Sequence, residues 1–246
     1  IGDWSSDVCS SDLVAVDEAE LDLVRAKHRL LTEHAIASEV LGPLELAGLE
    51  PNLRPNLAGG LLVPGDGVMN PPTATHWLLE RARAAGAVVL ERHHVDRIGP
   101  NTVYCGDDVY GAEFVVIAAG AETPRLIPEL PIVPRKGYLA ITDRYPGFVR
   151  HQLVELGYLA SANAISAASV AFNVQPRATG EVIVGSSREL VGWDATLDEG
   201  MLARMIARAS EYIPSLAALQ MVRRWCGFRP ATPDKLPLIG PWPSIP

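Results

Sequence analysis

Hydrophobic residues in the first part of the chain recur with helical spacing. Between residues 17 and 34, apolar side chains return every three or four positions, which predicts an amphipathic helix with Asp17 as its cap. Shorter helices are predicted over residues 43–50 and 73–86, and Gly86 is a typical C-terminal cap for the second. The first part of the chain is therefore expected to be partly helical.

Strand-like patterns fill most of the remaining sequence, and they are of two kinds. Residues 114–118 are apolar without interruption, which is typical of a strand buried on both faces in the parallel sheet of an α/β protein. Beyond residue 134 the pattern alternates, with Phe172 and Val174 expected on one face and Asn173 on the other. Further strands are predicted over residues 36–41, 61–63, 87–90, 94–98, 181–185 and 222–228, turns at residues 106–108 and 177–180, and a helix capped by Thr196, Asp198 and Glu199.

The composition excludes several classes of protein. The 246 residues are 48% hydrophobic, and Lys+Arg 21 against Asp+Glu 29 gives a net charge of -8. No apolar run approaches the roughly 20 residues of a transmembrane helix, and an acidic chain without a basic stripe is not expected to bind nucleic acid. Cys9, Cys105 and Cys226 lack the spacing of a zinc site or a redox pair, so we expect no metal and a reducing, cytoplasmic location.

The first thirteen residues, IGDWSSDVCSSDL, differ in character from the rest of the chain. They repeat Ser-Ser-Asp twice and show none of the periodicity that follows. Residues 4–13 resemble the one-frame translation of a common short-read sequencing adapter. We therefore expect residues 1–13 to be an artefactual, disordered segment, with the natural reading frame beginning upstream of Val14.

Motifs for several kinds of chemistry are missing from the printed sequence. Neither G-x-G-x-x-G nor G-x-x-x-x-G-K-[ST] occurs, so nucleotide binding cannot rest on a glycine loop. His93 and His94 are adjacent in a strand-like pattern, which directs them to opposite faces and prevents them from binding one ion. No G-x-S-x-G surrounds Ser161, Ser166 or Ser169, so hydrolysis has no support.

Five blocks of sequence, in this order, carry a resemblance that covers about residues 14–246. They are Glu50-Pro51-Asn52-Leu53, Pro64-Gly65-Asp66-Gly67-Val68-Met69-Asn70-Pro71, Val115-Val116-Ile117-Ala118-Ala119-Gly120-Ala121, Pro134-Arg135-Lys136-Gly137, and WCGFRPATPDKLPLIG at residues 225–240. The last block is the most specific. On these residues the chain resembles the D-amino-acid oxidase/glycine oxidase family of FAD-dependent oxidoreductases.

The resemblance implies an α/β (α+β) fold, in which a truncated FAD-binding Rossmann-like domain is interleaved with a mostly antiparallel β-sheet substrate domain. Residues 14–133 are then mainly the FAD-binding α/β domain with substrate-domain insertions, and residues 134–228 mainly the antiparallel substrate-binding domain. Residues 229–246 return to the FAD-binding domain. The family opens with a strand, G-x-G-x-x-G and a helix, and closes with a Gly-His-Gly-like segment, whereas this sequence has neither.

The resemblance also implies roles for individual residues. Arg229 matches the arginine that binds the substrate carboxylate, a role that suits a planar guanidinium with two parallel donors. A structural ion pair is its alternative role. Tyr138 or Tyr158 could add a hydroxyl to the same site. The positions expected at FAD are Val95, Ala118, Ala119, Gly120 and Gly240.

Two functions remain open at this stage. The first is FAD-dependent oxidation of the CH–NH bond of a small amino acid (D-amino acid, glycine or D-proline/hydroxy-D-proline type) by hydride transfer to the flavin, with the acceptor that reoxidises the flavin unknown. The fragment as printed is expected to be inactive. The second is a non-catalytic binding module, or an inactive fragment, that has lost the dinucleotide-binding strand. A flavoprotein acting on tRNA is disfavoured because the chain lacks a basic face.

Overall fold

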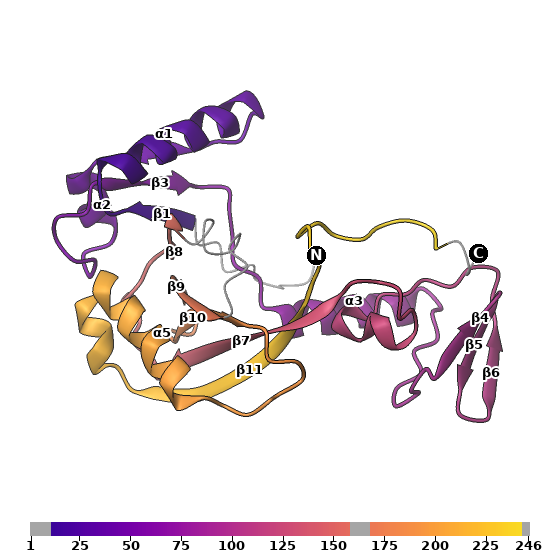
Figure 1. Cartoon of the computed structure of the whole chain (residues 1–246). Coiled ribbons are helices and arrows are strands. Elements are labelled where there is room, and N and C mark those ends of the chain that lie inside the picture. The colour runs from indigo at the N-terminus through magenta and orange to yellow at the C-terminus, as the bar shows by residue number, and fades with distance from the viewer. Residues whose placement is uncertain (1–10, 158–167, 243–246) are drawn as a thin grey trace.

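The computed structural model describes residues 11–157 and 168–242. Its strands are β1 (Ser11–Ala15), β2 (Glu39–Leu41), β3 (Gly59–Val63), β7 (Val133–Thr142), β8 (Gln152–Glu155), β9 (Ala168–Pro176), β10 (Val182–Glu189) and β11 (Met221–Ala231), together with three in a smaller sheet. The eight strands named here form one sheet in the order β11-β7-β10-β9-β8-β1-β3-β2 (Figure 1). Neighbours pair antiparallel except β1 and β8, which are parallel. The sheet therefore joins strands from both sides of residue 134, and β1 begins inside the segment 1–13.

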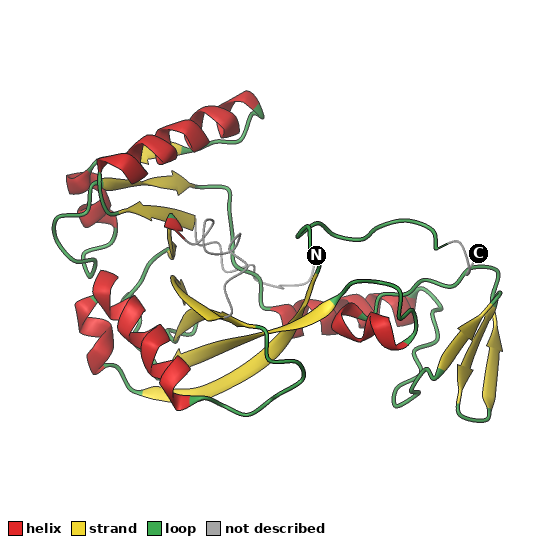
Figure 2. Ribbon diagram, viewed as in Figure 1, coloured by secondary structure: helices red, strands yellow, loops and turns green. Residues whose placement is uncertain are grey.

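Helices cover both faces of this sheet (Figure 2). They are α1 (Glu18–Glu33), α2 (Pro43–Leu49), α3 (Pro71–Ala84) and α5 (Glu199–Tyr212), with short 3-10 helices η1 (Gly120–Arg125) and η2 (Pro214–Ala218). α2 and α5 pack on one face, and α1 packs on the other face at the β1–β3 end. In the part of the chain that the structure describes, no helix has the length and apolar character needed to cross a membrane.

The caps predicted from the sequence explain where the helices start. Asp17 accepts a hydrogen bond from the Glu20 amide at 2.9 Å, and Asp198 accepts one from the Gly200 amide at 2.8 Å. α3 begins two residues earlier than predicted, at Pro71, with Asn70 as its N-cap. Prolines fit the first helical turn because the amides there have no partner within the helix.

The main core lies between the sheet and α5. Phe172 on β9 stacks on Tyr212 of α5 with ring centroids 4.3 Å apart and an interplanar angle of 3°. The Tyr212 hydroxyl donates to Glu155 at 3.0 Å, and Arg208 donates to the same carboxylate through Nε at 2.8 Å. Burial and the Glu155 charge raise the pKa of Tyr212. An apolar stack with one polar anchor at its end thus fixes α5 on the sheet.

A smaller sheet lies apart from the main body together with α3 (Figure 1). It consists of β4 (Arg97–Gly99), β5 (Thr102–Cys105) and β6 (Asp108–Gly111), in that order. The predicted hairpin at residues 106–108 is present, and Gly106 adopts a φ of 60° in its turn. Cys105 and Cys226 are both free thiols.

Two predicted strands are wrong. Residues 87–90 and 114–118 carry no regular secondary structure, and the side chains of Phe114 and Val116 are 73% and 87% exposed. A strand buried on both faces needs a hydrogen-bonded strand along each edge. Among the described strands none pairs with residues 114–118, so this apolar run stays irregular, with Val115 and Ile117 partly buried and the rest exposed.

β7 and β11 form a long antiparallel ribbon at one end of the sheet. Its register places Gly227 opposite Gly137, Arg229 opposite Arg135 and Pro230 opposite Pro134. Because neither proline has an amide hydrogen, the Pro134–Pro230 pair must be a non-hydrogen-bonded pair of the antiparallel ladder. The neighbouring residues make the hydrogen bonds between the two strands. The ribbon therefore continues past the proline pair, to Ala231 opposite Val133, without losing a β7–β11 hydrogen bond at the prolines.

Candidate functional site

One face of the β7–β11 ribbon is directed away from α5. Tyr138 and Ala140 on β7 pack in a core cluster with the α5 residues Met201, Leu202 and Met205. Since side chains alternate along a strand, residues 135, 137, 139 and 141 of β7 point to the opposite face of the sheet. The register then puts residues 225, 227 and 229 of β11 on that same face. We call this surface the ribbon face.

Arg229 lies on the ribbon face, and its side chain crosses the neighbouring strand. Nη1 donates to the carbonyl oxygen of Ser187 on β10 at 3.4 Å. β7 lies between β11 and β10 in the sheet, so the guanidinium passes over β7 to reach this carbonyl. It passes at Gly137, which offers no side chain. The residue that the sequence predicts at a substrate carboxylate is thus held at the sheet surface.

A group of side-chain amides continues the same sheet surface on β8 and β9. The Asn173 side-chain oxygen lies 3.4 Å from Nε2 of Gln152 and 3.5 Å from Nε2 of Gln175. Phe172 and Val174 face α5, so Asn173 is on the side away from that helix. The alternating sequence pattern predicts Asn173 on the face opposite Phe172 and Val174 but does not mark it as a site residue. The grouping of these three side-chain amides on one face depends on the register of β8 and β9, which the sequence alone does not show.

Tyr138 does not join Arg229. Its side chain is 0% exposed on the α5 side of the sheet, and its hydroxyl donates to the carbonyl of Thr196 at 3.4 Å. Lys136 has the same orientation and also donates to Thr196. The structure therefore separates the two residues predicted to act on substrate, because strand alternation puts positions 138 and 229 on opposite faces. Tyr158 lies outside the described residues.

The residues predicted at FAD lie outside strands β7 and β11, on exposed or irregular segments. Val95 is half-buried two residues before β4, and Ala118 and Ala119 are exposed. Gly120 and Gly240 have φ values of 57° and 153°, and a Cβ at either would meet no atom within 4 Å. Ala118, Ala119, Gly120 and Gly240 are therefore open surface, whereas Val95 is partly covered.

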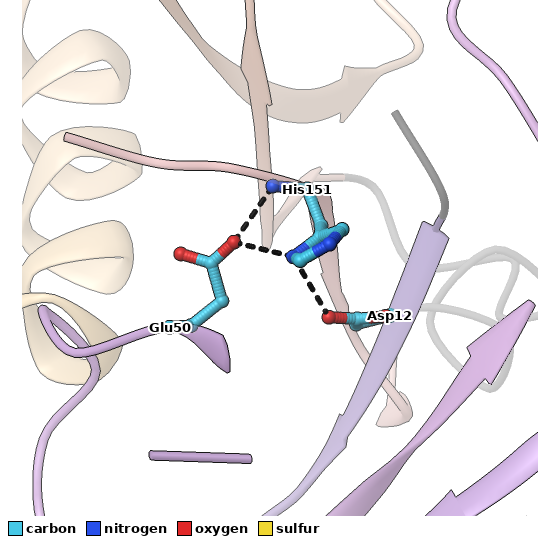
Figure 3. Close-up of side chains that lie close together, drawn as sticks. All are labelled: Asp12, Glu50 and His151. Atoms are coloured by element: carbon cyan, nitrogen blue, oxygen red, sulfur yellow. Dashed lines mark hydrogen bonds and ion pairs between the residues drawn. The ribbon is translucent and has the colours of Figure 1, made fainter. Parts of the chain in front are cut away.

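A separate cluster of ionisable groups joins Asp12 of β1 to His151 and Glu50 (Figure 3). Oε1 of Glu50, a residue that is 1% exposed, accepts from the amides of Arg150 and His151 at 2.9 and 2.7 Å, and from Nδ1 of His151 at 2.8 Å. Nδ1 of His151 is also 3.5 Å from Asp12. The Glu50 carboxylate thus joins the end of α2 to the approach to β8.

Asp12 is the unusual member of this cluster. Its side chain is 0% exposed, and neither carboxylate oxygen has a hydrogen-bond partner among the described residues. Burial raises the pKa of Asp12 to about 7, against the lowering effect of His151. Burial also raises the pKa of Glu50, against its backbone donors. Burial of these carboxylates therefore costs more free energy than their interaction with His151 returns.

These three groups could approach one metal ion, since their ligand atoms lie within 4.8 Å of one another. The hydrogen bonding argues against it. Oε1 of Glu50 already accepts hydrogen bonds from two backbone amides, which occupy its lone pairs. That the chain binds no metal stays a prediction.

Comparisons with known proteins place the chain among flavoenzymes. A family model described as FAD dependent oxidoreductase matches residues 7–245. The chain is 30% identical over 240 residues to a D-amino acid dehydrogenase of Xanthobacter autotrophicus, covering 90% of this chain and 53% of that protein. It is 32% identical over 135 residues to a glycine oxidase of Pseudomonas aeruginosa, covering 53% of this chain and 33% of that protein.

The solved structures support the fold. The glycine oxidase of Geobacillus kaustophilus superposes with a TM-score of 0.84 at 24% identity, covering 97% of this chain and 64% of that chain. The predicted α/β (α+β) class with a mostly antiparallel sheet is confirmed. The chain spans about half the length of the D-amino acid dehydrogenase and a third of the glycine oxidase that it matches in sequence.

Proposed function

Because the chain belongs to the family of FAD-dependent oxidoreductases, we propose that it supplies the substrate-binding sheet of an enzyme that oxidises the CH–NH bond of a small amino acid. A flavin, the cofactor that the family implies, would supply the acceptor for the hydride of the amino acid's α-carbon. A D-amino acid, glycine, or an amino acid of the D-proline or hydroxy-D-proline type is the proposed substrate. The names of the D-amino acid dehydrogenase and glycine oxidase relatives support this class.

The placement of Arg229 carries the proposal. Its guanidinium lies over Gly137 on the ribbon face, with Nη1 3.4 Å from the Ser187 carbonyl. A planar guanidinium held on a rigid sheet can bind a carboxylate by donating two parallel charge-assisted hydrogen bonds to it. Such a grip fixes the orientation of an amino acid, and orientation is a large part of what this chemistry requires from the protein.

FAD is the cofactor of the family, but the described residues do not by themselves form a site for it. Ala118, Ala119 and Gly120 are exposed, and nothing lies within 4 Å of where a Cβ of Gly120 would be. No strand among those described pairs with residues 114–118. A cofactor site needs a concave surface that buries most of its ligand. The residue-level proposal is therefore confined to recognition of the substrate carboxylate.

Replacing Arg229 with alanine is expected to weaken glycine binding at least about tenfold, because two charge-assisted hydrogen bonds are lost. Isothermal titration of the 246-residue chain with glycine and with glycinamide measures the effect. Glycinamide lacks the carboxylate, so its weaker binding should be unchanged by Arg229→Ala. Arg229→Lys keeps the charge but loses the fork, and its glycine affinity should fall between the two.

Arg223 provides the matched control for this experiment. It lies on the ribbon face of the same strand, opposite Ile141, and its guanidinium stacks 5.3 Å from the Trp225 ring. Arg223→Ala removes an identical charge from β11 and should leave glycine affinity unchanged. Equal losses in Arg223→Ala and Arg229→Ala would mean that general charge attracts the ligand, and the proposed role of Arg229 would then be wrong.

A non-catalytic binding module is the second candidate function. The exposure of Ala118, Ala119 and Gly120 favours it, because these are the positions expected at FAD. Quenching of FAD fluorescence on addition of the chain separates the two candidates. Glycine binding without FAD binding would favour the module, whereas binding of both ligands would favour the enzyme.

A further inference from the structure

Gly137 leaves the space that the Arg229 guanidinium fills. A Cβ built on Gly137 would lie 2.1 Å from Nη1, 2.8 Å from Cζ and 2.9 Å from Nη2 of Arg229. Real side chains do not approach so closely, so any residue larger than glycine must displace this guanidinium. The side chain of Arg229 therefore lies flat on the backbone of β7.

The backbone conformation does not require a glycine at this position. Gly59, Gly106 and Gly180 have positive φ values that other residues rarely adopt, but Gly137 is not among the residues with positive φ. It occupies a regular ladder position of β7, opposite Gly227 of β11. A glycine inside a strand is otherwise unfavourable, because it adds no packing and loses more backbone entropy on folding. Close approach by another group is the remaining physical reason for it.

The order of the strands explains why this space matters. Neighbouring strands are about 4.8 Å apart, and Arg229 extends from the outermost strand β11 over β7 to a carbonyl of β10. A side chain at the crossing point on β7 would lift the guanidinium away from Ser187 and turn its donors. Glycine at this one position fixes both the height and the direction of the fork above the sheet.

We propose that Gly137 is a positioning residue for carboxylate recognition, acting through Arg229 and not through contact with the substrate. The inference rests on the proposed function of Arg229 and adds a steric requirement to it. The site then selects for a substrate carboxylate that approaches a guanidinium lying flat on the sheet. Gly137→Ala should thus impair recognition of the carboxylate while leaving the fold intact, because the displaced group is the far end of a flexible side chain.

Gly227 offers a closely matched control. It is the direct partner of Gly137 in the ladder and lies on the same ribbon face, but a Cβ there would meet no atom within 4 Å. Gly137→Ala and Gly227→Ala therefore add the same methyl group to neighbouring positions of one ribbon. Only the first methyl group collides with Arg229.

The experiment compares Gly137→Ala, Gly227→Ala, Arg229→Ala and the double variant Gly137→Ala/Arg229→Ala in the 246-residue chain. The readout is the ratio of glycine to glycinamide affinity by titration calorimetry, which general loosening of the sheet would not change. Gly137→Ala should reduce this ratio about tenfold or more, Gly227→Ala should leave it unchanged, and the double variant should match Arg229→Ala. A normal ratio in Gly137→Ala beside a reduced one in Arg229→Ala overturns the inference and leaves the proposed function standing.

Thermal unfolding of the same four proteins tests the contact independently of ligand. If Arg229→Ala binds glycine normally, the proposed function fails, and the unfolding data then decide the role of Gly137. A decrease in Tm caused by Gly137→Ala that shrinks in the Arg229→Ala background supports the steric contact. An equal decrease in both backgrounds overturns it. If Gly137→Ala does not fold, recovery of folding in the double variant supports the inference, and failure to recover overturns it.

Discussion

Asp12→Val is expected to raise the free energy of unfolding by about 4 kcal/mol above pH 7. Burial raises the pKa of Asp12 from its ordinary 3.8 to about 7, and that difference is the cost of holding the ionised carboxylate in the folded chain. The Cα partners of Asp12 are Leu62 on β3 and Leu153 on β8, so valine continues an apolar row across three strands. Urea denaturation at pH 8 measures the gain.

The gain in stability from Asp12→Val is expected to increase with pH. Between pH 4 and pH 7 the folded chain keeps a proton on Asp12 that the unfolded chain has lost, so stability falls as the pH rises through this window. Above pH 7 both forms are ionised and the penalty is complete. The gain from Asp12→Val should therefore be several times larger at pH 8 than at pH 4.5.

Two variants control for this experiment. Asp12→Asn removes the charge but keeps a buried polar group, so it should recover only part of the gain. Asp107→Asn removes an exposed carboxylate from the β5–β6 turn and should leave stability unchanged. If Asp12→Val lowers stability at pH 8, the ion pair with His151 outweighs burial, and the cluster in Figure 3 is a stabilising one.

The cost at Asp12 bears on the first thirteen residues. A charged side chain without hydrogen-bond partners, flanked in register by leucines, is unusual in a buried strand. Such a residue is expected where a sequence foreign to the fold occupies the strand position. Sequencing the parent DNA across the Leu13/Val14 junction tests that expectation directly.

Phe172→Ala is expected to lower the free energy of unfolding by about 3–5 kcal/mol. The Phe172 ring is 0% exposed and stacks on Tyr212 at 4.3 Å, so its removal leaves a cavity between β9 and α5. The loss of the stack also removes an aromatic contact worth about 1 kcal/mol beyond buried area. Chemical denaturation followed by tryptophan fluorescence measures the change.

Phe114→Ala is the matched control, and it also tests the correction to the predicted strand. The Phe114 side chain is 73% exposed, so its removal should change stability by less than about 0.5 kcal/mol. If residues 114–118 were instead a strand buried on both faces, this variant would lose as much stability as Phe172→Ala. Similar losses in the two variants would therefore contradict the exposed placement of this segment.

The elements that local sequence determines were predictable. Asp17 and Asp198 cap the helices that they were expected to cap, and residues 177–180 form the turn between β9 and β10. Capping and turn formation depend on residues within one or two turns of chain, so a sequence window contains the whole cause. The prediction of a strand over residues 114–118 was wrong because a strand depends on partner strands from distant parts of the chain.

The candidate site could be predicted only in part. The resemblance selected Arg229, but its contact with Gly137 depends on the β7–β11 register, which no local pattern defines. The same limitation explains the misplacement of Tyr138, since no local pattern showed which face of the sheet its side chain would occupy. The clustering of Asp12, Glu50 and His151 brings together three segments that are far apart in the chain.

The paired prolines of the ribbon also affect how copies of the chain can associate. β11 is the outermost of the described strands on its side of the sheet, so its outer row of amides is open to pairing with another chain. Because the Pro134–Pro230 pair is not directly bonded, the nitrogen of Pro230 points outward, and the outer row lacks a donor there. The exposed cationic side chain of Arg223 adds repulsion between two such edges. The strand that carries Arg229 is thereby a poor template for edge-to-edge growth into fibres.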